Sequence, residues 1–197
     1  MESATSHPVD EIIGPTSSFL ESAIDGLRSL GIDNLESYEI DHICYRCESI
    51  LEYKDVCRKL NNFGIPLTEG MIANRPICIY LLDEAITFKT WKISCIEIPC
   101  PKEGSYYSAG LEHLEMVIGT ESDVPPKSTK LLLESFAQMY PTVAFDRKAI
   151  DKEINADISL SLSNGSSVKF HARPIYEICA YETDNGLVEV VPDGYFD

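Results

Sequence analysis

The sequence predicts an α+β fold in which one β-α-β-β-β unit occurs twice. Three observations support this prediction. Segments rich in β-branched and apolar residues fill most of the stretch 39–171, two amphipathic helices interrupt them, and the order of strand, helix and further strands is the same each time. The two units share little sequence identity, so the repeat is one of architecture. A chain of 197 residues is long enough for one such domain.

A helix is predicted ahead of the first unit, over residues 15–31. Ser18-x-x-Glu21 fits a capping box, and Gly31 follows as a helix stop. The apolar residues between them recur at helical spacing: Leu20, Ile24, Leu27 and Leu30.

Each unit contains one predicted helix. In the first unit the helix begins at a second capping box, Ser49-x-x-Glu52, and covers residues 49–63. In the second unit it covers roughly 127–139 and ends before Pro141, which cannot continue a helix.

The remaining segments read as strands, and Asn164-Gly165 is typical of a hairpin turn between the last two. The predicted strands are 39–46, 70–82, 84–98, 111–118, 157–163 and 167–171.

The chain therefore divides into three parts. Residues 1–14 are expected to be a flexible N-terminus, and residues 183–197 an acidic tail. A single domain is expected over 15–182, with one module at about 38–102 and the other at about 110–182.

Charge and hydropathy limit the class of function. The formal net charge is −16, from 32 acidic and 16 basic side chains, which argues against a nucleic-acid or anionic membrane surface. No run of about 18 apolar residues predicts a transmembrane helix, and the first residues do not read as a secretory signal. We therefore expect a cytoplasmic protein with small-molecule or protein partners, and a small-molecule substrate as the leading expectation.

Seven cysteines cannot all pair within one chain, and without an export signal reduced thiols are expected. Cys44-x-x-Cys47 resembles half of a zinc knuckle, but no second close pair is in register with it, since Cys95 and Cys100 are five residues apart. Buried thiols that act as small hydrophobic groups are the simpler interpretation.

Four polar residues stand inside predicted strands whose opposite faces are apolar. Alternation along a strand gives His42, Glu97, His113 and His171 the face opposite the apolar one, where an unpaired charge or imidazole is costly to bury. Coordination of a divalent metal would remove that cost. Imidazole nitrogen and carboxylate oxygen suit zinc, iron, nickel or manganese.

The spacing of these residues follows the repeat. His42 and Glu97 are 55 residues apart, and His113 and His171 are 58 apart, so each unit offers one residue from its first strand and one from its last. A single strand histidine is more often a hydrogen-bonded structural residue, and a strand glutamate often faces solvent. It is the joint pattern of four that favours a metal site.

Several of these segments resemble the successive motifs of the YecM-like family, which belongs to the vicinal oxygen chelate superfamily with glyoxalase I, bleomycin-resistance proteins and extradiol dioxygenases. The segments are DHICYRC, NRPICIYLL, CIEIPCPK, GLEHLEMVIG and NGSSVKFH, and the resemblance spans about residues 17–182. It implies two βαβββ modules that form a cup-shaped mixed sheet around one divalent metal, with helices on the outer face. The implied ligands are His42, Glu97, His113 and His171. Glyoxalase I commonly has glutamate at the position of His171.

The strand faces suggest roles for residues around the expected metal. Glu115 shares a face with His113 and could be a general base, a substitute ligand or a hydrogen-bonding group of the cup. Arg46, Arg75 and Lys169 could each hold a substrate carboxylate, or form ordinary salt bridges. Asp41 should point away from His42 and serve as a local backbone partner, with a role as orienter of a ligand as the alternative.

The predicted function is a divalent-metal-dependent enzyme that acts on a small oxygen-rich or carboxylated metabolite. Isomerase, lyase, hydrolase and dioxygenase chemistry all suit this scaffold, and fold does not choose among them. The alternative is a non-catalytic small-molecule-binding protein of the same fold. A third hypothesis is an interaction protein that uses its tails. Either a monomer or a homodimer fits, because both modules lie in one chain.

Overall fold

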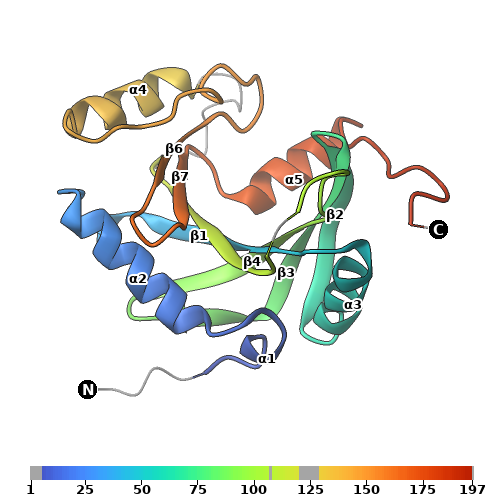
Figure 1. Ribbon diagram of the computed structural model, residues 1–197. Helices are drawn as coiled ribbons and strands as arrows, with labels where there is room; N and C mark the ends of the chain where they lie inside the picture. The colour runs from blue at the N-terminus through green and yellow to red at the C-terminus, as the bar shows by residue number, and fades with distance from the viewer. Residues whose placement is uncertain (1–5, 107, 120–128, 197) are drawn as a thin grey trace.

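A mixed sheet of seven strands organises the computed structural model, which describes residues 6–106, 108–119 and 129–196 (Figure 1). The strand order is β2-β3-β4-β1-β5-β7-β6. The strands are β1 Glu39–Arg46, β2 Gly64–Ile72, β3 Arg75–Phe88, β4 Trp91–Pro99, β5 Gly110–Val117, β6 Asp157–Ser161 and β7 Ser167–His171. The helices are α1 Asp10–Ile13, α2 Thr16–Ser29, α3 Ile50–Leu60, α4 Lys130–Met139 and α5 Ile175–Asp184, with a 3₁₀ turn at Leu35–Ser37. The predicted α+β class with an N-terminal helix is confirmed.

The two modules meet at the centre of the sheet. β1 pairs in parallel with β4 in the first module, β5 pairs in parallel with β7 in the second, and β1 and β5 are antiparallel neighbours. The first module has the full β-α-β-β-β order. In the second, an isolated bridge between Asp146 and Ser159 stands beside β6 in place of a further strand.

The strands of the first module differ from their predicted boundaries. The predicted strand 70–82 is two strands, because Ala73 and Asn74 both adopt positive φ (52° and 64°) and form the turn between β2 and β3. Tight hairpin turns need positive φ angles, and glycine is the residue that usually occupies such positions. Lys89 at φ 53° marks the next turn in the same way.

The apolar faces of the strands pack under three helices. α2, α3 and α4 all bury residues against this outer face, so the expected position of the helices is confirmed. On α4, for example, the ring of Phe136 lies 4.8 Å from that of Phe170 on β7. The largest buried side chains of this core include Leu20, Ile24, Leu27, Ile40, Ile43, Tyr53, Leu60 and Phe170.

The fifth helix lies on the opposite, inner face and was not predicted. Ile175, Ile178 and Cys179 of α5 pack against Ile77 and Ile79 of β3, in a small cluster separate from the main core. Their i, i+3, i+4 spacing is helical, but the run is short and Pro174 directly precedes it. α5 runs beside β2 in Figure 1 and covers part of the inner face.

Both ends of the chain are more ordered than expected. Residues 1–5 lie outside the described residues, but Val9 and Ile13 are buried in the main core, so the prediction of a flexible segment is wrong for the residues around α1. At the other end, Met71 N donates a hydrogen bond to Glu189 O, and the ring of Phe196 stacks on Tyr53 at 5.6 Å. The acidic tail therefore packs against β2 and α3.

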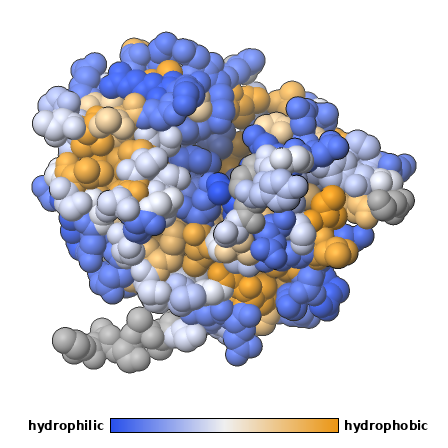
Figure 2. All heavy atoms as spheres, in the orientation of Figure 1, coloured by the Kyte–Doolittle hydropathy of each residue, from blue (hydrophilic) through white to orange (hydrophobic). Residues whose placement is uncertain are grey.

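Hydrophilic residues cover much of the face seen in Figure 2, and hydrophobic residues form separate patches on it. None of the helices in the described parts of the chain has the length and apolar character needed to cross a bilayer.

Helix starts follow the sequence signals only in part. Ser49 Oγ accepts a hydrogen bond from Glu52 N at 3.1 Å, so the predicted cap of α3 is confirmed. The predicted capping box at Ser18 is wrong, because α2 begins two residues earlier, at Thr16. Ser18 Oγ donates a hydrogen bond to Pro15 O instead. Proline at this point suits a helix start because its missing N–H would be unpaired anyway.

The hairpin at Asn164-Gly165 is confirmed but contains a longer loop than two residues. Leu162 N donates to Ser166 O, so three residues form the loop, and Gly165 takes φ 88°. Asn164 Oδ1 accepts from Ser166 N and steadies the turn.

Replacement of the α3 cap tests this account of the helix start. Ser49→Ala should lower the free energy of unfolding by about 1 kcal/mol, because the N–H of Glu52 loses its acceptor. Urea denaturation measures the change. Ser18→Ala is the matched control and should stay within about 0.5 kcal/mol of the parent. Equal losses in the two variants would contradict the assignment of the cap.

Candidate metal centre

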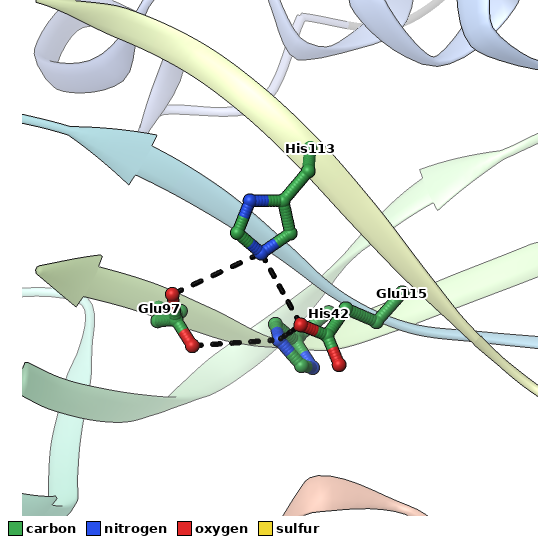
Figure 3. Close-up of side chains that lie close together, drawn as sticks. All are labelled: His42, Glu97, His113 and Glu115. Carbon is green, nitrogen blue, oxygen red and sulfur yellow. Dashed lines mark ion pairs between the residues drawn. The ribbon is translucent and has the colours of Figure 1, made fainter. Parts of the chain in front are cut away.

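Two imidazoles and two carboxylates converge on the inner face at the centre of the sheet. Figure 3 shows His42 on β1, Glu97 on β4, and His113 and Glu115 on β5, with the four side chains directed toward one another. The strand register explains the convergence: His42 lies opposite Glu115, and Cys44 lies opposite both Glu97 and His113. Three neighbouring strands from both modules thus contribute to one group.

Distances within this group suit a common metal ion. Nε2 of His42 lies 3.5 Å from Glu115 Oε1 and 4.0 Å from Glu97 Oε2. Nε2 of His113 lies 3.2 Å from the same Glu115 oxygen and 3.8 Å from Glu97 Oε1. One candidate ligand atom from each residue lies within 4.8 Å of all the others. Ligands about 2.0–2.2 Å from a zinc-like ion are themselves about 3–4 Å apart, so the residues fit such an ion.

The protein leaves the ligand atoms of both histidines without hydrogen bonds. Nε2 of His42 and Nε2 of His113 are buried, and neither has a hydrogen-bond partner of suitable geometry. Buried polar atoms are nearly always satisfied, so unpaired nitrogens that face two carboxylates need a physical explanation. A bound cation would supply one.

A β-bulge places Asp41 beside His42 instead of on the opposite face. The pairing of β1 with β5 skips one residue between Ile40 and His42, so the alternation of side chains fails there and the predicted orientation of Asp41 is wrong. Asp41 Oδ2 accepts a hydrogen bond from His42 Nδ1 at 2.8 Å, and both carboxylate oxygens lie 3.0 Å from Ile175 N at the start of α5.

Sequence reasoning gave this network no clear signal. A β-bulge within a strand as short as β1 produces no recognisable sequence pattern. The helix α5, which supplies the N–H of Ile175, was not predicted. The Nδ1 contact directs the other nitrogen of His42, Nε2, toward the carboxylates. Asp41 therefore orients the ring, which the sequence had offered only as the alternative.

His171 lies on the same face but joins a second group, with Asp41 and His42. Its Nε2 is 3.3 Å from Asp41 Oδ2 and its Nδ1 is 3.1 Å from Asn155 Oδ1. Of the four expected ligands, the structure brings together His42, Glu97 and His113, and it adds Glu115 to them instead of His171.

The strand register shows why the two modules differ at this point. Glu97 pairs with Cys44 across β4 and β1, and the equivalent pair in the second module is Lys169 with Glu115 across β7 and β5. Lys169 therefore occupies the position related to Glu97, two residues before His171. Its Nζ lies 2.5 Å from Glu115 Oε1, so an ion pair occupies the position related to Glu97, while the expected ligand His171 lies two residues further along β7.

Arg46 and Arg75, the other two cations expected to bind substrate, lie in two different hollows. Arg46 forms an ion pair with Glu112 and lines a smaller hollow outside the group. Arg75 lines the same cavity as the group, at the start of β3, and donates from Nη1 to Cys100 O at 3.3 Å.

Electrostatics hold the carboxylates of the site ionised. Burial alone would raise the pKa of Glu115, but Lys169 and His42 lower it well below its ordinary value. The pKa of Glu97 is also lowered, because Lys169 and His113 outweigh burial. Burial would raise the pKa of Asp41, but the adjacent rings of His171 and His42 outweigh burial and lower this pKa to about 2.

The two histidines of the group respond in opposite directions. Burial favours the neutral ring of His42, but the carboxylates of Glu115 and Asp41 outweigh it and raise its pKa to about 10. Burial and the nearby ammonium of Lys169 lower the pKa of His113. Without a metal, His42 is therefore the imidazolium that balances the carboxylates.

A cavity of about 440 Å³ opens beside the group. Its lining includes the candidate ligands, the cations Arg75, Lys152 and Lys169, further acidic and polar side chains, and isoleucines of β3 and α5. A second hollow of about 540 Å³, between α2 and the start of β5, is lined by no carboxylate, imidazole or ammonium group. Of these two hollows, only the cavity at the group is lined by carboxylate, imidazole and ammonium groups.

Comparisons with known proteins agree with this architecture. Protein YecM of Escherichia coli is 30% identical over 164 residues, which cover 81% of this chain and 87% of that protein. An uncharacterized protein of Haemophilus influenzae is 32% identical over 85 residues, or 43% of this chain and 44% of that protein. A solved structure named "Structural Genomics, Protein EC4020" has a TM-score of 0.64 at 27% identity, and covers 84% of this chain and 87% of its own.

The family model described as "YecM protein" matches residues 9–182, which include both modules, the candidate ligands and most of α5. The match covers most of the chain, and the paired modules have the arrangement that the vicinal oxygen chelate resemblance implied. The chain belongs to the YecM family.

Proposed function

We propose that this chain is a divalent-metal-dependent enzyme that acts on a small oxygen-rich or carboxylated metabolite. The observation that carries the proposal is the unpaired, buried Nε2 of His42 and of His113, directed at two carboxylates at the wall of a cavity. A divalent ion held by His42, Glu97, His113 and Glu115 would act as a Lewis acid toward substrate oxygens.

The side chains around the ligands have distinct roles in this proposal. Asp41 fixes the ring of His42 so that Nε2 faces the cavity. Lys169 neutralises one of the two carboxylates and keeps Glu115 ionised. Because its pKa is far below neutral, Glu115 is better suited to hold a cation than to accept a proton as general base. The reaction class is left open between isomerase, lyase, hydrolase and dioxygenase.

One observation favours the alternative, a small-molecule-binding protein that does not catalyse. The ion pair of Lys169 with Glu115 at 2.5 Å already satisfies one carboxylate within the protein, and the imidazolium of His42 balances further charge. A cavity of this kind can bind a ligand without any metal. Metal analysis separates the two proposals. In both, the partner is a small molecule, and the assembly is a monomer or a homodimer.

Metal content is the first test. Untagged protein should retain about one transition-metal ion per chain, measured by mass spectrometry of the metals. His42→Ala and His113→Ala should each reduce this to near zero, because each removes one imidazole of a four-residue site. His7→Ala, outside the cavity, is the control and should keep its metal.

His171→Ala distinguishes the two possible ligand sets. Metal retained in this variant supports Glu115 as the fourth ligand, and metal lost supports the set implied by the resemblance. A parent protein that binds no metal at all would overturn the proposal and leave the non-catalytic alternative.

The role of Asp41 can be measured through metal affinity. Asp41→Asn removes the charge that holds His42 but keeps an oxygen for the N–H of Ile175, so metal affinity should fall about 10–100-fold while the fold persists. Competition with a chelating dye gives the affinity. Asp157→Asn, on the same cavity wall but paired with Lys152, should change it less than threefold. Equal effects in both variants would contradict a specific role.

Metal binding should also release a proton. The pKa of His42 is raised to about 10, so at pH 8 its ring is protonated in the metal-free protein and must lose the Nε2 proton to become a ligand. The pKa of His113 is lowered, so His113 should release none. Calorimetry in two buffers of different ionisation enthalpy should give about one proton per metal. Affinity should rise with pH up to about 10. Release of no proton would contradict this account of His42.

A further inference from the structure

Three lysine or arginine side chains line the cavity, and two of them are already neutralised. Lys169 pairs with Glu115 at 2.5 Å, and Lys152 pairs with Asp157 at 2.9 Å. Arg75 differs from both. Within the described parts of the chain, no carboxylate lies at ion-pair distance from its guanidinium, although the protein has twice as many acidic as basic residues.

The guanidinium of Arg75 has unused hydrogen-bonding capacity. Nη1 donates to Cys100 O at a long 3.3 Å, and Nε is buried with no hydrogen-bond partner in the protein. Arginine offers five donors in a planar fork, and a carboxylate matches two of them at once. A half-buried cation of this kind on a cavity wall is suited to an anionic group of a ligand.

Arg75 lies at the far end of the cavity from the candidate metal ligands. Arg75, Ile77 and Ile79 alternate along β3 and face the cavity, and Ile79 pairs with Glu97 of β4. Four residues of strand therefore separate Arg75 from the level of Glu97, which is about 13 Å along the backbone.

The wall between these two ends is mainly apolar. Ile77 and Ile79 form one side, and Ile175, Ile178 and Cys179 of α5 pack against them and line the cavity as well. The cavity thus has a polar end at the histidines and carboxylates, an apolar middle, and a single unpaired cation at its other end.

We propose that the ligand of this cavity is an amphipathic acid, with an oxygen-bearing head at the His42–Glu97–His113–Glu115 group, an apolar chain along the isoleucines, and a carboxylate on Arg75. The assignment of the head rests on the proposed function, but the assignment of the carboxylate to Arg75 does not.

A singly charged carboxylate fits better than a phosphate. Arg75 supplies one positive charge, and Glu182 at the end of α5 also lines the cavity. A phosphate would add a charge of about −1.5 to −2 to a cavity that already holds that carboxyl group, with one unpaired cation to balance it.

Matched probes test the proposal by direct binding. The compounds 2-oxoadipate and 2-oxohexanoate have the same chain length and the same oxo-acid head, and only the first has a carboxylate at its tail. Titration calorimetry in the presence of zinc should show at least tenfold tighter binding of 2-oxoadipate to the parent protein. The homologous pairs one carbon shorter and one carbon longer allow for the length of the cavity.

Variants assign the difference to Arg75. Arg75→Gln should weaken the binding of 2-oxoadipate at least tenfold, to the affinity that the parent has for 2-oxohexanoate. The affinity for 2-oxohexanoate should change less than threefold. Arg75→Lys should keep part of the preference, because it keeps the charge without the fork. Lys152→Gln is the matched control, and it should keep the full preference because Lys152 is already paired.

The outcomes separate this proposal from the metal proposal. Arg75→Gln should bind zinc with the affinity of the parent, which shows that the variant is folded and its metal group intact. If the parent binds no metal, a comparison of the affinities for adipate and hexanoate in the metal-free protein tests the role of Arg75 alone. Equal binding of the mono- and dicarboxylates at every length, or a preference that survives in Arg75→Gln, would overturn the proposal.

Discussion

The antiparallel pairing of β1 with β5 is the constraint on which the rest of the structure depends. It joins the two modules at the middle of the sheet, and it gives His42, His113 and Glu115 the same inner face although the modules are separate in sequence. Each central strand then takes a parallel neighbour, and the one beside β1 brings Glu97 into the group. A slip of one residue in this register would turn these side chains toward the apolar core.

Charges at this depth persist only because each has a partner. His42 and Asp41 are fully or almost fully buried, as are His113 and Glu115, and isolation of any one charge there would be costly. The structure balances them through one continuous set of contacts, from the backbone at the start of α5 through Asp41 and His42 to Glu115 and Lys169. The cost of burial is therefore offset locally, and the side chains are held rigid at the point where they face the cavity.

Much of the fold could be predicted because its signals are local. Periodicity indicated β1, α3 and β7 closely, and Ser49 marked the start of α3. The inward face of His42, Glu97 and His113 followed from the same alternation. The misses have physical reasons. Ala73-Asn74 forms a tight turn without glycine, and a bulge reverses Asp41.

The fourth ligand position depended on register, which sequence spacing does not fix. Lys169 and His171 lie two residues apart on the same face of β7, so only the pairing with β5 shows which of them matches Glu97. α5 was missed because a helix of ten residues gains its stability mostly from packing, here against β3 and over the cavity.

The chain segments beside the two outermost strands bear on how copies of this protein can meet. Glu189 accepts the backbone N–H of Met71 on β2, and Asp146 forms a bridge with Ser159 on β6. Unpaired outer strands are templates on which another chain can add its own strand. Here irregular segments of the same chain already occupy part of each position. Continuous sheet growth from one copy to the next would have to displace these segments first.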